Sequence, residues 1–134
     1  MAPRVRGPIQ RVYEAFSAYE ASASGLSREN LARLLAGGES ETLELKRSTS
    51  ELTSGMQTLC GMLNNRGGTV VFGVDDSGRI VGQQVSASTL EKVSTALREI
   101  EPAPPARIDR VEAEVGRPVV TVSVSPGNAP ALLL

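Results

Sequence analysis

Residues 64–78 read NNRGGTVVFGVDDSG, a turn signal followed by a short apolar run and two adjacent acids. Glycines at 67 and 68 allow the backbone to adopt positive φ. The run 69–74 is short and rich in β-branched residues, which predicts a buried central strand rather than a helix. Asp75 and Asp76 then stand at the end of this strand, where Ser77 and Gly78 turn the chain back. We expect the other elements to support this strand or to bring charges to its end.

The segment before the central strand predicts a second strand and a covering helix. Residues 42–46 alternate strictly, so Leu43 and Leu45 face the core while Glu44 and Lys46 share the other face. A helix follows residues 48–50, and its apolar positions repeat at helical spacing. These positions are Leu52, Met56, Leu59, Cys60 and Leu63.

Two further helices are predicted nearer the N-terminus, over residues 9–22 and 27–36, with Ser27 as the N-cap of the second. We assign residues 1–37 to an N-terminal helical arm that packs or dimerises. A helix-turn-helix is the less favoured alternative, because the second helix carries little positive charge.

After the central strand, residues 79–82 predict a short strand that forms a hairpin with it. Ser88 and Glu91 predict a capping box for the next helix, which the prolines from Pro102 onward end. Residues 106–115 and 118–124 predict two strands joined at Gly116, with a bulge at residues 109–110. The order of elements predicts an α+β (mixed α/β) domain over residues 38–134, with a mixed β-sheet covered by helices.

The composition excludes several classes of function. The chain has 134 residues, a net charge of -1, 3% aromatic residues, no histidine and one cysteine. Nucleic-acid binding by bulk positive charge, Ser-His catalysis and zinc sites built with histidine are therefore excluded. No run is long enough to span a membrane, and residues 1–8 lack the apolar core of a signal peptide, so we expect a cytoplasmic protein.

The charged residues around the two predicted strands suggest a metal site. If the strands are neighbours, Glu39, Glu44, Asp75 and Asp76 meet Lys46 at one edge of the sheet. Carboxylate oxygens suit Mg²⁺ or Mn²⁺, and a metal with a nearby lysine suits phosphodiester cleavage. The alternative is a solvated ion pair on the first strand and ordinary turn chemistry at the aspartates. No Gly-x-x-x-x-Gly-Lys motif is present, so we expect no ATP site.

Residues 39–46 (ESETLELK) and 64–76 (NNRGGTVVFGVDD), separated by a helix, resemble the Schlafen-type AlbA-like DNA-binding domain over about residues 38–134. That family was once labelled a divergent AAA domain. The resemblance implies nucleic-acid binding of the kind described for bacterial transcriptional regulators. Schlafen relatives cleave RNA with three acids and a metal. By position these acids fall on Glu39, Glu44 and the aspartate pair, with Asp76 preferred, and Lys46 matches the family lysine.

The resemblance also sets two expectations about completeness. The family continues beyond residue 134 with a further strand, so we expect a domain truncated at its C-terminus. Schlafen enzymes use two lobes to form one groove, so a single lobe would need a homodimer, which we expect to use the arm residues Tyr13, Phe16 and Tyr19.

Three functions remain open from the sequence. The leading one is a DNA- or RNA-binding domain of a bacterial transcriptional regulator. The alternatives are a metal-dependent endoribonuclease and a nucleotide-responsive or dimerising module. The expected nucleic-acid contacts are Lys46, Arg47, Arg66, Arg4, Arg6 and Arg11.

Overall fold

The structure is a computed structural model that describes residues 26–113, 116–127 and 130–133. The predicted helix 9–22 and the basic and aromatic residues of the arm lie outside the described residues. The elements in chain order are α2 (Arg28–Ala36), β1 (Leu43–Lys46), η1 (Thr49–Glu51), α3 (Leu52–Leu63), β2 (Gly68–Phe72), α4 (Ala87–Leu97), β3 (Ile100–Glu101), β4 (Ala106–Val111), β5 (Val119–Val124) and β6 (Leu132–Leu133).

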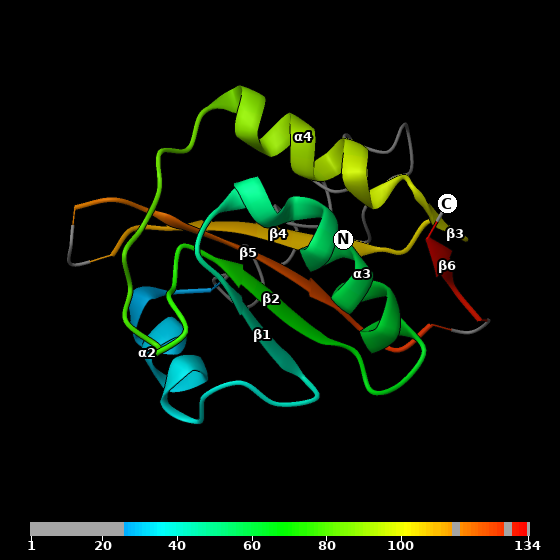
Figure 1. Ribbon diagram of the computed structural model, residues 1–134, viewed down its shortest axis with the longest axis horizontal. Coiled ribbons are helices and arrows are strands. Elements are labelled where there is room, and N and C mark those ends of the chain that lie inside the picture. Colours follow the sequence, from blue (N-terminus) through cyan, green and yellow to red (C-terminus); the bar gives the residue numbers. More distant parts are fainter. Residues whose placement is uncertain (1–25, 114–115, 128–129, 134) are drawn as a thin grey trace, which may run out of the picture.

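The fold is mixed α/β, as the sequence predicts (Figure 1). Four strands form a sheet in the order β1-β2-β5-β4, and β3 pairs with β6 in a separate two-stranded sheet. β1 runs parallel to β2, whereas β5 runs antiparallel to both β2 and β4. The predicted central position of β2 is therefore confirmed. Among the described residues, no helix is long and apolar enough to cross a membrane.

Each face of the four-stranded sheet has its own apolar core. α3 and α4 cover one face, where Met56, Leu59 and Val93 pack with Phe72 and Val122. Figure 1 shows α3 in front of the sheet and α4 along the top of the view, above β4. α2 packs on the other face through Leu31, whose side chain is fully buried among residues of β1, β2 and β5. Although the sequence grouped α2 with the arm, its side chains are part of this second core.

The glycines around β2 have positions that a side chain would not tolerate. Gly67 has φ of 78°, and a β-carbon there would lie 2.5 Å from the carbonyl oxygen of Val124. Gly73 has φ of 119°, and a β-carbon there would lie 2.9 Å from the side chain of Val119. The turn before β2 and the close backbone approach at Gly73 are thus confirmed.

The prediction that residues 79–82 form a strand paired with β2 is wrong. The pairing with the chain leaving β2 is limited to one isolated bridge, between Val74 and Ile80, beside which the N–H of Asp75 donates to the carbonyl oxygen of Arg79. The N–H groups of Val81 and Gly82 both donate to the carbonyl oxygen of Gly73. With Gly82 at φ of 66°, the chain turns away instead of continuing a ladder.

Two other local predictions need correction. The capping box of α4 uses Ser86 and Thr89, not Ser88 and Glu91, because Ser86 has the extended backbone of an N-cap. The predicted bulge at residues 109–110 is absent, since β4 and β5 pair without interruption from Ala106 to Val111. Asp109, at the expected bulge, is instead buried in a regular strand and pairs with Arg107 at 2.8 Å.

Candidate nucleic-acid interface

Glu39 bonds to the outer edge of β1. β1 is an edge strand, and its backbone turns alternately toward β2 and away from it. On the outer side, Leu43 exchanges backbone hydrogen bonds with Ser40, and the N–H of Leu45 donates to Oε2 of Glu39 at 3.0 Å. This carboxylate therefore satisfies a backbone donor that an edge strand would otherwise leave open.

Glu44 and Lys46 lie side by side on the face of β1 that adjoins α3. They stand opposite Val70 and Phe72 of β2, which belong to the α3 core. Their side chains form an ion pair at 3.3 Å and are 26% and 14% exposed, respectively. The predicted shared face is confirmed, and the lysine is largely engaged by its neighbouring acid.

Asp75 organises the turn that follows β2. Its Oδ1 atom accepts hydrogen bonds from the hydroxyl of Ser77 at 2.6 Å and from the N–H groups of Ser77 and Arg79 at 3.0 Å. The Ser77 hydroxyl bond, together with these N–H groups and the charge of Arg79, lowers the pKa of Asp75 below 3.8. Asp75 thus has the geometry of a turn-forming residue.

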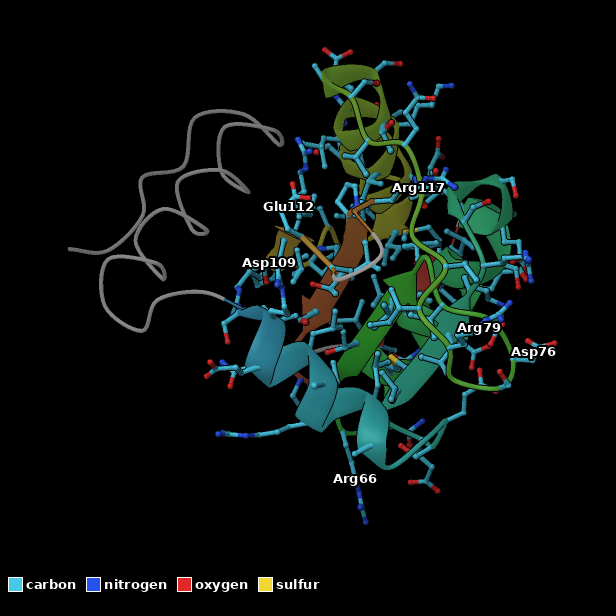
Figure 2. The ribbon with its side chains drawn as sticks, turned by 90° about the vertical axis from the view of Figure 1, so that its left-hand side faces the viewer. Arg66, Asp76, Arg79, Asp109, Glu112 and Arg117 are labelled. Atoms are coloured by element: carbon cyan, nitrogen blue, oxygen red, sulfur yellow. The ribbon has the colours of Figure 1, made fainter. Side chains whose placement is uncertain are left out.

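Asp76 is exposed on the same turn, and Figure 2 shows it at the margin of the molecule beside Arg79. The structure does not gather the predicted acids into a metal site. Within the described part of the chain, no three His, Cys, Asp or Glu side chains are grouped so that they could hold a metal ion. The described acids therefore do not form the three-carboxylate group suggested by the sequence.

Three segments meet where β1 and β2 end, at the left of Figure 1. The carbonyl oxygen of Lys46 accepts from the N–H of Gly73, which joins the end of β1 to the end of β2. The N–H of Gln83 donates to the carbonyl oxygen of Pro118, which brings the β4–β5 hairpin to the same place. We call this region the sheet end and define it by residues 46–49, 73–83 and 117–118.

The sheet end carries two exposed arginines that are not neutralised by an ion pair. Arg47 follows β1, and Arg117 lies on the β4–β5 hairpin. No acid in the described ranges forms an ion pair with either of them. Arg79 is also exposed but pairs with Asp75 at 3.4 Å. Sequence reasoning did not single out Arg117, because it was read only as part of a turn.

Arg66 lies at the opposite end of the sheet. It belongs to the turn between α3 and β2, where β2 begins, whereas Arg47 stands where β1 ends. Since β1 and β2 are parallel, the two predicted contacts are separated by the length of the strands. Figure 2 shows Arg66 well apart from Arg79 and Arg117. The structure therefore brings together Lys46 and Arg47, but not Arg66.

Comparison with known families gives one match. A family model described as Schlafen, AlbA_2 matches residues 39–133, which is more than half of the chain. A search of curated proteins finds no match. The matched range contains β1, the α3–β2 turn and the whole sheet end.

Proposed function

The chain belongs to the Schlafen AlbA_2 family, and on this premise we propose that it binds the phosphate backbone of DNA or RNA at the sheet end. The observation that supports this site is that Arg47 and Arg117, from distant parts of the chain, are exposed on two segments that both bond to Gln83 at the sheet end. Arginine is well suited to phosphate because its guanidinium group offers several donors in a fixed plane. Contacts of this kind position a nucleic acid without reading its sequence.

The charge balance of the sheet end predicts weak binding. Glu44 pairs with Lys46, and Asp75 pairs with Arg79, so two of the nearby cations are already neutralised. Arg47 and Arg117 remain to attract phosphate. We therefore expect low affinity that depends strongly on salt, because each neutralised phosphate releases counterions.

Fluorescence anisotropy with labelled single-stranded DNA, duplex DNA and structured RNA tests this proposal. Arg47→Ala and Arg117→Ala should each weaken binding to all sequences alike. Each change should also lower the salt slope by about 0.7 to 0.9 if one phosphate contact is lost. Arg98→Ala is the matched control, because Arg98 is exposed at the C-cap of α4 and its side chain bonds to Thr95. Equal loss in the control, or affinity that does not change with salt, would refute the proposed site.

Arg66→Ala separates a local footprint from a longer one. If the bound strand runs along the whole sheet, this change weakens binding as much as Arg47→Ala. If the strand contacts only the sheet end, Arg66→Ala behaves like the control.

Nuclease activity is the alternative function. It finds less support, because Glu39, Glu44 and Asp75 each bond to a group of the protein and the described acids do not cluster. A cleavage assay on structured RNA with Mn²⁺ tests it, with Glu44→Gln as the diagnostic variant. Cleavage that Glu44→Gln abolishes would favour the nuclease over simple binding.

A further inference from the structure

Gln83 is a buried polar residue that joins two other segments of the sheet end. Gln83 is only 5% exposed. Oε1 accepts from the N–H of Thr49 at 2.9 Å, while Nε2 donates to the Thr49 hydroxyl at 3.0 Å and to the carbonyl oxygen of Gln84 at 3.2 Å. Both amide donors and the amide oxygen are therefore engaged. The backbone N–H of Gln83 adds a bond to Pro118 at 2.9 Å.

The residue before Gln83 tightens the same junction. Gly82 has φ of 66°, and a β-carbon there would lie 2.6 Å from the β-carbon of Arg117. Its N–H donates to the carbonyl oxygen of Gly73 at 2.8 Å. The loop is thus packed directly against the hairpin residue that carries one of the exposed guanidinium groups.

The residues to which Gln83 bonds are close in sequence to the two exposed arginines. Thr49 is two residues after Arg47, and Pro118 directly follows Arg117. β1 and the β4–β5 hairpin are not paired with each other in the sheet, because β2 lies between β1 and β5. Gln83 therefore supplies a direct link across the sheet end between the segments that carry the two arginines.

We propose that Gln83 is a positioning residue that holds Arg47 and Arg117 at a fixed spacing for one nucleic-acid backbone. This inference rests on the proposed function. Two phosphate contacts reinforce each other only when their spacing matches that of the phosphates, and a loose spacing costs ordering entropy on binding. A satisfied buried amide fixes that spacing more firmly than an apolar residue, which would leave the Thr49 N–H without its partner.

The spacing can be measured without any nucleic acid. Spin labels are attached through Arg47→Cys and Arg117→Cys in a Cys60→Ala background, and the distance distribution between them is recorded. Gln83→Met keeps the approximate shape of the side chain but removes its side-chain hydrogen bonds to Thr49 and Gln84, so we expect a broader distribution. Gln84→Met is the matched control, because Gln84 is exposed, and it should leave the distribution unchanged. Gln83→Glu keeps the acceptor for Thr49 and should broaden the distribution less.

Binding measurements then test the functional consequence. In proteins with native Arg47 and Arg117, Gln83→Met should weaken nucleic-acid binding several-fold at a temperature where circular dichroism reports a folded protein. The salt slope should fall by about 0.7 to 0.9, as for one lost phosphate contact. If Gln83 had only a structural role, Gln83→Met would lower the melting temperature but leave the label distance and the salt slope unchanged. That result would overturn the proposal. If Gln83→Met broadens the label distances but the wild type binds no nucleic acid, Gln83 positions the two segments and the proposed function is refuted.

Discussion

The Glu39 carboxylate accepts a hydrogen bond from the N–H of Leu45 at 3.0 Å, across the open edge of β1. The acid that the family resemblance places in a catalytic set is therefore engaged with the backbone. Together with the Ser40–Leu43 bridge, it closes the outer side of the edge strand. Edge strands with free N–H groups invite pairing with other chains, so this contact also hinders strand pairing at this edge.

Glu39→Ala should destabilise the protein by about 1 to 2 kcal/mol, because the Leu45 N–H loses its partner. Glu39→Gln should cost less, since an amide oxygen can accept the same hydrogen bond. Urea unfolding of both variants measures the difference. Equal losses in the two variants would show that the charge matters rather than the bond to the edge strand.

The lowered pKa of Asp75 gives the protein a pH-dependent contribution to stability. The folded pKa lies below the unfolded value of 3.8, so the ionised form is favoured by folding. The contribution is complete at pH values above 3.8 and is lost as the pH falls through the lower folded pKa. The difference in unfolding free energy between the wild type and Asp75→Ala should therefore shrink in acid. Urea unfolding of the wild type and Asp75→Ala at neutral and at acidic pH measures this change.

Two glycines of α3 should respond in opposite ways to alanine. A β-carbon at Gly55 would lie 2.7 Å from the ring of Phe72, which is fully buried, whereas nothing lies within 4 Å of one at Gly61. Gly61→Ala should stabilise the helix by about 0.5 to 1 kcal/mol. Gly55→Ala should destabilise the protein, because overpacking against Phe72 typically costs about 1 to 3 kcal/mol and outweighs the helix gain. Thermal unfolding should rank the two variants on opposite sides of the wild type.

The hydroxyl of Thr121 offers a stabilising substitution. It is buried in β5 without a hydrogen-bond partner. Thr121→Val should raise the free energy of unfolding by about 0.5 to 1.5 kcal/mol, because it removes a buried group that has lost its contact with water. Thr69→Val is the contrasting change, since the Thr69 hydroxyl bonds to that of Ser123 at 2.9 Å, and it should destabilise. A loss of stability in Thr121→Val would mean that the hydroxyl finds a partner in solution.

The sequence by itself determined the elements whose signals are local. The apolar run of β2, the alternation in β1 and the spacing of apolar residues in α3 each predicted the observed element, because burial imposes a period of 2 on strands and 3.6 on helices. Ser27 was also a sound N-cap prediction, since its hydroxyl accepts from the N–H of Asn30 at 3.1 Å.

Only the tertiary structure decided how the charged residues are used. Spacing along the chain placed Glu39, Glu44 and the aspartates near one another. Yet each of Glu39, Glu44 and Asp75 found a partner through the register of β1 and the turn after β2. Arg47 and Arg66, which seemed equivalent in sequence, stand at opposite ends of parallel strands. The link from Gln83 to Thr49 joins residues 34 positions apart, and no local pattern encodes a hydrogen bond between segments that meet only when the sheet forms.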